Sequence, residues 1–432
     1  MIYGGEGLAR LPADEKGRGK AVFLPFTLPG ERVEAAIREE KPGFVRAAIS
    51  GVLEASPQRV MARCPYFQHC GGCHYQHTGY EQQLLIKAEI LKENLRRLAK
   101  LESTPELKVH PSPPWNYRNR TRLQLRGEPD FALGYLRAGS HEVLPVESCP
   151  ISSPLLNRAI AVLWTLGREG RIPVEISSIE LYADAEDQKL QADLYVAPRD
   201  NGSAVRTKLQ TFSESLHAAL PEMVSACAFA QTVGSGRGRP TRADVPTEWA
   251  LQPGTFFYQT KRGPLRVSGG SFFQVNRYLV DALVDTVAGG RAGDVALDLY
   301  AGVGLFTLAL ASSFRHIVAV ESSQGSARDL QYNSPENVKV VRSTVDEYLT
   351  AKVKIRPDLI LADPPRAGLG ERVTRGLINL GAAQLVYVSC DPATLARDLK
   401  TLLAGGYRIA QMQLMDLFPQ TYHIETVVEL AR

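Results

Sequence analysis

Short apolar stretches alternate with turn residues along the first 54 residues of this 432-residue chain. In KAVFLPFTLPGERVEAAI, residues 20–37, Pro and Gly separate apolar segments that are too short for helices. Short strands between turn signals are typical of a small β-barrel. We therefore expect a barrel over residues 1–54, followed by a region of mixed strands and helices over residues 55–255.

Residues 256–432 show another pattern, in which apolar strands alternate with helices. DVALDLY (294–300), HIVAVE (316–321), DLILADPP (358–365) and LVYVSC (385–390) each contain an apolar run of strand length. This alternation predicts an α/β fold with an open, mainly parallel, doubly wound sheet.

A helical period runs through YEQQLLIKAEILKENLRRLAK, residues 80–100. Apolar residues spaced three and four apart mark the side of a helix that packs against another element. The residues expected on this buried side are Leu84, Leu85, Ala88, Leu91, Leu95 and Leu98.

Four side chains that could bind a ligand or react follow the strands of the expected sheet. Tyr300, Glu321, Asp363 and Cys390 each stand at a strand end. Ligands of open α/β sheets bind at the carboxyl ends of the strands, so we expect one composite site there. The glycine turn AGVG (301–304) and Glu321 suit NAD and S-adenosyl-L-methionine equally well.

Cys390 and Glu425 have opposite chemical roles in this expected site. A lone cysteine after an apolar strand is usually a packed core thiol, but the ligand edge of the sheet favours a nucleophile. Its thiolate would add to carbon 6 of a uracil ring and make carbon 5 electron-rich, ready to accept a methyl group from a sulfonium donor. Glu425 interrupts an apolar strand, and this unusual position makes it the candidate base for the carbon 5 proton.

The overall composition is that of a folded protein without a membrane span. Hydrophobic residues make up 44% of the chain and charged residues 22%, and no apolar run approaches the ~18 to 20 residues that cross a bilayer. The first residues, MIYGGEGLAR, lack the basic and apolar regions of a secretory signal. We expect a monomer in the cytoplasm, with no membrane partner, in a compartment where disulfides are rare.

Positive charge is concentrated in one part of the chain, although the net charge is only +4. Residues 87–126 contain ten Lys and Arg against four Glu. On an extended strand, Arg118, Arg120 and Arg122 would share one face. That face is either simply solvated or, with Trp115 and Tyr117 as stacking surfaces, an RNA contact. The polar segment GSGRGRPTR (234–242) predicts an exposed basic loop.

Three of the six cysteines lie within ten residues, at Cys64, Cys70 and Cys73, and Cys149 in VESCP is a distant fourth. In a reducing compartment such a set points to a metal rather than to disulfides. The spacing fits zinc and iron about equally. Cys227 is interpreted as a core residue.

Five ordered motifs resemble those of the RNA uracil-C5 methyltransferases. They are FFQVN (272–276), LDLYAGVGLFTL (297–308), ADPPRAGL (362–369), VYVSCDPATLARDL (386–399) and YHIETVVEL (422–430). In addition, YGGEGLAR (3–10) is similar to the start of a TRAM domain. The resemblance implies a Rossmann-like class I methyltransferase domain over 256–432, an OB-like TRAM barrel over 1–54 and a central α+β iron–sulfur and RNA-binding domain over 55–255. It also implies that the helix over 80–100 packs on the catalytic domain.

The resemblance also implies site residues. Cys390 would be the nucleophile and Glu425 the proton acceptor, as the chemistry above suggests. The residues implied to contact S-adenosyl-L-methionine are Gln274, Tyr300, Glu321 and Asp363, and those implied to hold a [4Fe-4S] cluster are Cys64, Cys70, Cys73 and Cys149. The cluster spacing resembles the branch that methylates ribosomal RNA, so the expected reaction is uridine C5 methylation in 23S ribosomal RNA.

Three positions depart from the family pattern, and one of them is Thr344, which lies where many relatives have an acid near the adenine. Leu305 replaces a cofactor-contacting asparagine of many relatives, and Asp391 replaces the commoner asparagine after the nucleophile, where it adds negative charge that disfavours a thiolate. The alternatives to a ribosomal RNA enzyme are a transfer RNA 5-methyluridine methyltransferase, with zinc in place of the cluster, and a catalytically idle RNA-binding assembly factor.

Overall fold

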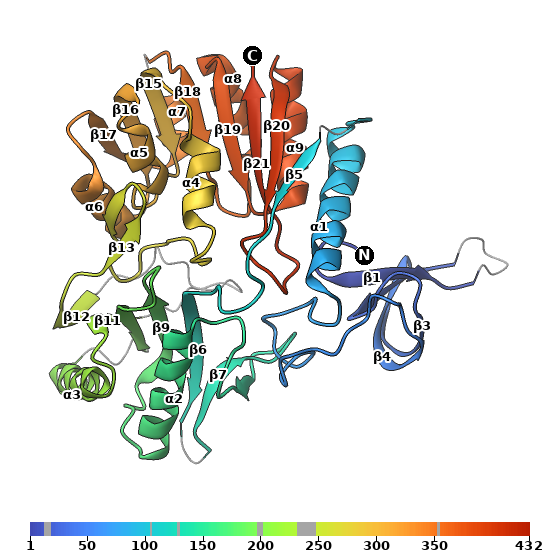
Figure 1. Ribbon diagram of the computed structural model, residues 1–432, viewed down its shortest axis with the longest axis vertical. Coiled ribbons are helices and arrows are strands. Elements are labelled where there is room, and N and C mark those ends of the chain that lie inside the picture. Colours follow the sequence, from blue (N-terminus) through green and yellow to red (C-terminus); the bar gives the residue numbers. More distant parts are fainter. Residues whose placement is uncertain (13–18, 104–105, 128–129, 197–201, 231–247, 352–354) are drawn as a thin grey trace.

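The computed structural model describes residues 1–432 except 13–18, 104–105, 128–129, 197–201, 231–247 and 352–354. The expected basic loop at 234–242 therefore lies outside the described residues. Figure 1 shows three β-structures: a small one near the N-terminus, a central one, and a large sheet that contains the C-terminus. None of the described helices combines the length and apolar character of a bilayer span.

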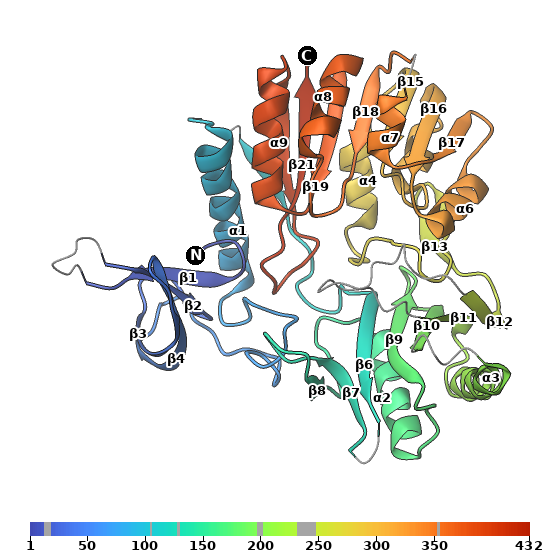
Figure 2. The ribbon, with the colours of Figure 1, turned by 180° about the vertical axis from the view of Figure 1, so that it is seen from behind.

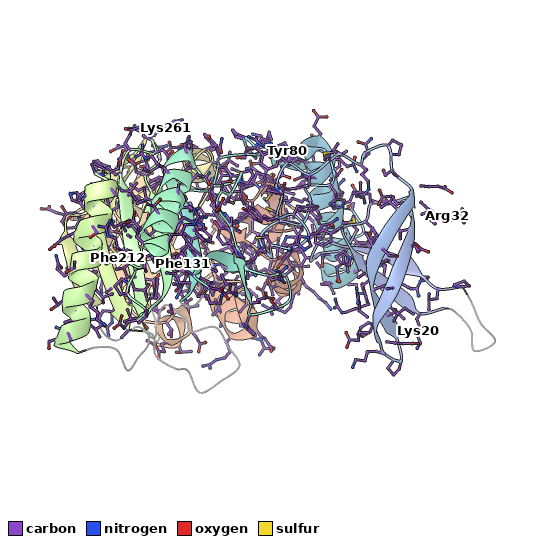
Figure 3. The ribbon with its side chains drawn as sticks, turned by 90° about the horizontal axis from the view of Figure 1, so that it is seen from below. Lys20, Arg32, Tyr80, Phe131, Phe212 and Lys261 are labelled. Carbon is purple, nitrogen blue, oxygen red and sulfur yellow. The ribbon has the colours of Figure 1, made fainter. Side chains whose placement is uncertain are left out.

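The N-terminal sheet has four strands in the order β1-β2-β4-β3. The strands are β1 (Glu6–Arg10), β2 (Ala21–Pro25), β3 (Arg32–Glu40) and β4 (Phe44–Glu54). The expected N-terminal set of short β-strands is present. Among the described residues, β1 and β3 are the edges of this sheet, so the pairing does not close into a barrel. Its buried core consists of Val22, Leu24, Val45 and Ala47. Figure 3 shows this sheet, marked by Lys20 and Arg32, standing to one side of the rest.

The central sheet has seven strands in the order β12-β11-β10-β9-β6-β7-β8. Their bounds are β6 (Arg120–Arg126), β7 (Ala132–Leu136), β8 (Val143–Pro145), β9 (Ile176–Ala183), β10 (Leu190–Val196), β11 (Met223–Ala230) and β12 (Glu248–Pro253). Helices α2 (Pro154–Arg168) and α3 (Ser203–Ala219) pack their apolar sides against it in one core. Ser153 caps α2 and Pro154 begins it, as helix starts commonly do.

The C-terminal sheet has eight strands in the order β17-β16-β15-β18-β19-β21-β20-β5. Their bounds are β5 (Leu107–His110), β15 (Gly293–Leu299), β16 (Phe314–Glu321), β17 (Val338–Arg342), β18 (Leu359–Ala362), β19 (Gln384–Ser389), β20 (Arg408–Met415) and β21 (Glu425–Ala431). Only β21 is antiparallel to its neighbours. Strand β5 comes from the expected central region but pairs with β20 at the edge of this sheet. A hairpin of β13 (Phe257–Thr260) and β14 (Gly263–Arg266) leads into this part.

Helices cover both faces of the C-terminal sheet, as a doubly wound fold requires. One core contains residues of α4 (Val280–Ala288), α5 (Leu305–Leu310) and α6 (Gln324–Asn333). The opposite core contains residues of α1 (Tyr80–Asn94), α7 (Val345–Thr350), α8 (Gly370–Leu380) and α9 (Pro392–Ala404). Figure 2 shows α1 running beside α9, and a π-helical turn over Leu95–Ala99 extends α1 along it.

The buried side of α1 differs from the expected one. Leu85 and Leu98 are 60% and 45% exposed, whereas Gln83 and Lys87 are 1% and 0% exposed. The prediction was confirmed for Ala88, Leu91 and Leu95, which are buried, and was wrong for Leu85 and Leu98. Gln83 and Lys87 are buried in addition, because both polar side chains find hydrogen-bond partners in the loop over residues 416–424. Polar partners elsewhere in the chain therefore widen the buried side of α1 beyond its apolar residues.

Candidate active site

The carboxyl edge of the C-terminal sheet brings four of the predicted site residues together. Tyr300, Asp363 and Cys390 directly follow β15, β18 and β19, and Glu321 is the last residue of β16. These four strands are consecutive neighbours in the sheet. The ends therefore form one continuous edge, the usual ligand side of such a fold.

Glu321 fixes the glycine turn that follows β15. Its carboxylate accepts hydrogen bonds from the main-chain N–H of Gly302 at 2.9 Å and of Ser323 at 2.6 Å. Gly304 has φ +98°, a left-handed conformation that glycine adopts at no steric cost. Tyr300 has φ 61° without being glycine, which marks a strained backbone at the start of the turn. The turn is thus held rigidly between two strands.

Asp298 is a buried carboxyl group of the site that the sequence reasoning missed. It is 0% exposed, and its Oδ2 accepts a hydrogen bond of 2.5 Å from the Thr307 hydroxyl. Burial raises the pKa of Asp298 to about 7. Burial, with the charge of Asp298, also raises the pKa of Asp363 to about 7. The acid in the otherwise apolar strand DVALDLY was the available signal, of the same kind that marked Glu425.

The end of β19 brings Cys390 close to Glu425. Ser389 on β19 pairs with Thr426 on β21, and Cys390 and Glu425 are the residues next to this last pair. Glu425 is 5% exposed, and burial with the charge of Asp363 raises its pKa. Burial, followed by the charges of Glu425 and Asp363, raises the pKa of the Cys390 thiol to about 12. The thiol and the two carboxyl groups therefore form one electrostatic unit.

Arg366 supplies positive charge beside this unit. Its charge acts to lower the pKa of both Cys390 and Glu425. The guanidinium Nη2 lies 3.0 Å from Nδ1 of His423, whose pKa burial and Arg366 lower to about 3. His423 is thus a neutral acceptor that holds Arg366 in place. The carboxylate of Asp391 accepts hydrogen bonds from Ala393 and Thr394 and caps α9, which gives this departure from the family pattern a structural role.

Gln274 lies in the connection between β14 and α4 rather than at a strand end. It is 8% exposed. Among the described residues, no hydrogen bond links its side chain to Tyr300, Glu321 or Asp363. The connection itself is fixed to the central sheet, because the carbonyl of Val275 accepts a hydrogen bond from the N–H of Asn119.

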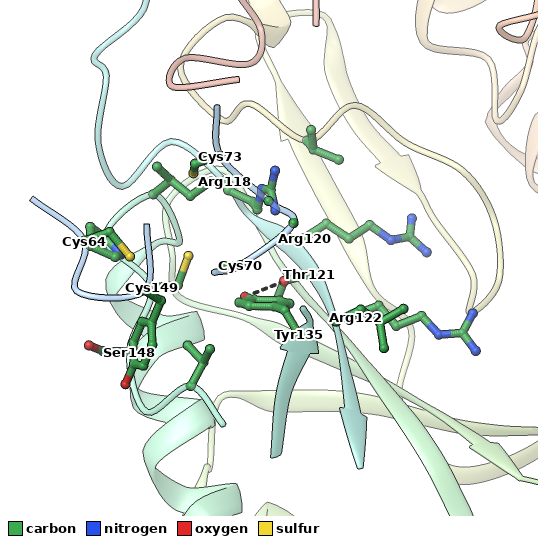
Figure 4. Close-up of a pocket in the computed structure, with 18 of the residues that line it drawn as sticks. Cys64, Cys70, Cys73, Arg118, Arg120, Thr121, Arg122, Tyr135, Ser148 and Cys149 are labelled. Carbon is green, nitrogen blue, oxygen red and sulfur yellow. Dashed lines mark hydrogen bonds between the residues drawn. The ribbon is translucent and has the colours of Figure 1, made fainter. Parts of the chain in front are cut away.

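The four predicted metal ligands line one cavity of about 520 Å³ next to the central sheet. Figure 4 shows Cys64, Cys70, Cys73 and Cys149 gathered at one end, with Arg118 near Cys73. All four are free thiols. Burial is the largest cause that raises the pKa of Cys70 to about 11 and of Cys73 to about 12, and the charge of Cys149 acts in the same direction.

The two candidate metal groups require different spacings of their sulfur ligands. Across the described part of the chain, no three or more His, Cys, Asp or Glu side chains are grouped to hold a metal ion. A single zinc would need its sulfur ligands within about 3.8 Å of one another, given Zn–S bonds of about 2.3 Å in a tetrahedron. A cluster with four irons binds each thiolate to a different iron, so its ligands stand farther apart around a larger cavity.

The three arginines expected on one strand face, either solvated or in contact with RNA, differ in exposure: Arg120 is buried, whereas Arg118 and Arg122 are half-buried. The three side chains follow one another along the wall of the cavity (Figure 4). Arg120 is 5% exposed and forms an ion pair of 2.7 Å with Glu180. The guanidinium of Arg122 lies 3.7 Å from the ring centroid of Tyr195.

Tyr117 is also not the exposed stacking surface that the sequence suggested. It is fully buried, and its hydroxyl donates to the carbonyl of Pro419 at 2.9 Å. Trp115 is half-buried with the guanidinium of Arg63 at 5.1 Å from its ring centroid. The sequence therefore did not predict how far Tyr117 and Trp115 are exposed to solvent.

The doubly wound sheet with an antiparallel β21, together with a glycine turn and acidic strand end at its carboxyl edge, defines a class I methyltransferase fold. The particular family follows from the sequence. The model of the tRNA (uracil-5-)-methyltransferase family matches residues 79–432, and that of the TRAM domain matches residues 3–49. The chain belongs to the tRNA (uracil-5-)-methyltransferase family, and the prediction of a methyltransferase that uses S-adenosyl-L-methionine is confirmed.

Relatives over the whole chain carry the same general description. The chain is 32% identical to an uncharacterized RNA methyltransferase of Aquifex aeolicus, with 100% of this chain and 96% of the relative covered. It is 33% identical to an uncharacterized RNA methyltransferase of Streptomyces avermitilis, with 100% and 96% covered.

A solved structure shares the fold over the full length. It is the tRNA (uracil-54, C5)-methyltransferase of Pyrococcus abyssi in complex with S-adenosyl-L-homocysteine. The TM-score is 0.72 at 24% identity, and 99% of this chain and 100% of the other are covered. At this identity the match supports the fold, including the N-terminal sheet and the central part.

Proposed function

We propose that this protein methylates carbon 5 of uridine in RNA through a covalent bond between Cys390 and carbon 6 of the base. The observation that carries the proposal is that Cys390 and Glu425 lie next to the last residue pair of β19 and β21, at the sheet edge that also holds the glycine turn. A half-buried thiol close to a buried carboxyl group suits an addition that must later be reversed by proton removal.

The residues of the chain divide the reaction between them. S-adenosyl-L-methionine supplies an electrophilic methyl group when it is bound. Tyr300, Glu321, Asp363 and Gln274 bind and orient it, and the Cys390 thiolate attacks carbon 6 of the uracil, which directs electron density to carbon 5. After carbon 5 has gained the methyl group, Glu425 accepts its proton. The electron pair of that C–H bond forms the C5–C6 double bond, and the C6–S bond breaks to release the Cys390 thiolate.

The electrostatics explain why Arg366 belongs to this site. The neighbouring carboxyl groups and burial disfavour the Cys390 thiolate, since they raise its pKa to about 12. Arg366 acts in the opposite direction on both Cys390 and Glu425. We therefore assign Arg366 the role of stabilising negative charge on whichever of the two is ionised.

Two variants separate the two chemical roles. Cys390→Ala should form neither methylated RNA nor a covalent complex. Glu425→Gln should transfer the methyl group but remain attached to the RNA, as a slow band on a denaturing gel. Glu429→Gln, on the same strand, is the matched control and should release its product normally. Normal turnover by Glu425→Gln would assign the base to another residue, and an adduct in Cys390→Ala would assign the nucleophile elsewhere.

The proposed RNA is 23S ribosomal RNA, and the four-cysteine set supports this choice. Transfer RNA is the second candidate, because the fold of the transfer RNA enzyme from Pyrococcus abyssi overlaps the whole chain, including its N-terminal sheet. The presence of the TRAM strands therefore does not separate the two substrates. Transfer of a labelled methyl group to ribosomal and transfer RNA that lack 5-methyluridine, followed by mapping, decides between them.

We also propose that Cys64, Cys70, Cys73 and Cys149 hold a [4Fe-4S] cluster. The supporting observation is the gathering of four free thiols around one cavity, with Arg118 beside them to offset negative charge. Protein purified without oxygen should be brown with about four irons per chain. Cys73→Ser should lose the colour and Cys227→Ser, in the core, should keep it. Colourless protein with one zinc per chain would contradict the cluster.

The remaining expectations concern the state of the protein in the cell. We propose a monomer of the cytoplasm whose macromolecular partner is RNA. Light scattering after gel filtration should give the 47.4 kDa mass of one chain, and a doubled mass at micromolar concentration would contradict the monomer.

A further inference from the structure

The loop over residues 416–424 connects β20 to β21 and ends directly at Glu425. At its centre, Gln420 has φ 68°, a conformation that is uncommon for a residue other than glycine. The carbonyl of Gln420 accepts hydrogen bonds from the N–H groups of His74 at 2.7 Å and Tyr75 at 3.0 Å. His74 directly follows Cys73, so the cysteine segment and the loop before Glu425 are joined by main-chain hydrogen bonds.

Gln83 of α1 lies at the junction of these two segments and is 1% exposed. Its Oε1 accepts from the N–H of Gln420 at 3.0 Å, and its Nε2 donates to Oε1 of Gln420 at 3.0 Å. The same Nε2 donates to the carbonyls of Tyr75 at 3.1 Å and Thr78 at 3.0 Å. One buried amide therefore fixes both the end of the cysteine segment and the centre of the loop.

Further contacts hold the rest of the loop in the same way. The ammonium of Lys87 donates to Asp416 at 2.5 Å and to the carbonyl of Phe418 at 2.9 Å. The ring of Tyr422 packs edge-on against His74, with centroids 4.5 Å apart. These partners all come from the N-terminal third of the chain, so segments outside the C-terminal sheet hold a large part of the loop.

The loop leads to only one of the reacting groups. Tyr300, Glu321 and Asp363 stand at the ends of β15, β16 and β18, and Cys390 follows β19. Glu425 alone follows the loop. A shift of the loop should therefore move the proton acceptor relative to carbon 5 of the base. The glycine turn and Cys390 follow other strands, and the loop reaches the surroundings of Cys390 through the contact of His423 with Arg366.

We propose that Gln83 is a positioning residue for Glu425, and that through it the cysteine segment controls the release step of the reaction. The proposal rests on the proposed function. The affected step is the last one: the proton of carbon 5 passes to the Glu425 carboxylate, the C5–C6 double bond forms and the C6–S bond breaks. Methyl transfer precedes this step and does not depend on Glu425.

The test compares Gln83→Met with wild type and with Gln82→Met, its half-buried neighbour on α1. Methionine keeps the length of the side chain but removes every hydrogen bond of the amide, including those that share the two hydrogens of Nε2. In single-turnover experiments with labelled cofactor, Gln83→Met should form the methylated adduct at a rate within about twofold of wild type and resolve it about 100-fold more slowly, the usual effect of misplacing a catalytic group by about 1 Å. Its affinity for the cofactor, measured by calorimetry, should be unchanged, and Gln82→Met should resemble wild type.

The outcomes distinguish this inference from the proposed function. Wild-type enzyme that neither methylates uridine nor forms an adduct would refute the proposed function. Wild-type enzyme that does both, while Gln83→Met resolves its adduct at the wild-type rate, would refute the positioning role alone. Equal losses of methyl transfer and release in Gln83→Met would also refute it, since they indicate general damage.

Two further variants test the proposal independently of Gln83→Met. If Gln83→Met does not fold, Gln420→Gly removes one hydrogen bond to Gln83 and suits the left-handed backbone, so it should slow release about fivefold. Cys73→Ser should also slow release, by a larger factor than it slows methyl transfer. Release at the wild-type rate in Gln420→Gly overturns the role of Gln83, and in Cys73→Ser it overturns the control by the cysteine segment.

Discussion

Replacing Lys87 by Met should open the contact between α1 and the loop over residues 416–424. The Lys87 ammonium and the Asp416 carboxylate are 2.5 Å apart, with side chains 0% and 1% exposed. The substitution leaves the Asp416 carboxylate buried with the hydroxyl of Tyr80 at 2.8 Å as its remaining side-chain partner. An ionised carboxylate in such a position has lost both its countercharge and its hydration.

The magnitude follows from this burial. Breaking a buried ion pair by removing one partner costs about 3–5 kcal/mol. Because Tyr80 still donates to Asp416, we expect the lower end, about 3 kcal/mol. The exposed pair of Lys92 and Glu89 on the same helix should contribute less than ~1 kcal/mol, so Lys92→Met is the matched control. In the double variant Lys87→Met with Asp416→Asn, most of the loss should be recovered, because no buried charge remains.

Native-state hydrogen exchange measured by mass spectrometry is the suitable assay, since it reports the opening of one region in a protein with several sheets. Peptides covering α1 and residues 416–424 should exchange about 100-fold faster in Lys87→Met, which is what a loss of about 3 kcal/mol produces when opening is in equilibrium. Peptides of α3 should be unchanged. If these peptides exchange no faster in Lys87→Met than in Lys92→Met, the ion pair does not stabilise the contact between α1 and the loop.

Three further predictions concern the site and the cavity. Glu321→Ala should weaken cofactor binding at least 10-fold, because the glycine turn loses two hydrogen bonds of about 1 to 1.5 kcal/mol each. Its RNA affinity should stay near wild type. Unchanged cofactor affinity by calorimetry would contradict this role. Since the pKa of Cys390 is raised to about 12, only its small thiolate fraction reacts at neutral pH. Alkylation of the cofactor-free enzyme should therefore accelerate about 10-fold per pH unit from 7 to 10. A plateau near pH 8 would contradict the raised pKa. Because the guanidinium of Arg120 pairs with Glu180, Arg120→Met should reduce the free energy of unfolding by about 3 kcal/mol. The salt dependence of RNA binding should stay unchanged. A fall of ~0.7 to 0.9 in the slope of log affinity against log salt would instead show a phosphate contact.

Much of the C-terminal sheet and its edge could be predicted from the sequence, because these features depend on local patterns. An apolar run of strand length that ends in an acid, a cysteine or a glycine turn determines both the strand and the side chain at its end. The ends of neighbouring parallel strands then meet by geometry alone. Glu425 was recognisable for a related reason, since a carboxyl group in an apolar strand is costly unless it has a function or a partner.

The buried side of α1 shows how far a local pattern reaches. The structure buries Ala88, Leu91 and Leu95 as expected. It also buries Gln83 and Lys87 and exposes Leu85. The decisive partners, Gln420 and Asp416, lie at the other end of the chain. A buried polar group is acceptable only where such a partner exists, and no period within the helix carries that information.

The arginines after Tyr117 illustrate the same limit for the central sheet. Their alternation correctly predicted a shared face, but charge alone suggested that this face was open to RNA. Folding places a cavity against it, where Glu180 pairs with Arg120 and Tyr195 packs on Arg122. The sequence by itself thus determined which residues carry chemistry and which side of a strand they share. Only the tertiary structure decided what they face, because burial and pairing depend on segments that are distant in sequence and are brought together by packing.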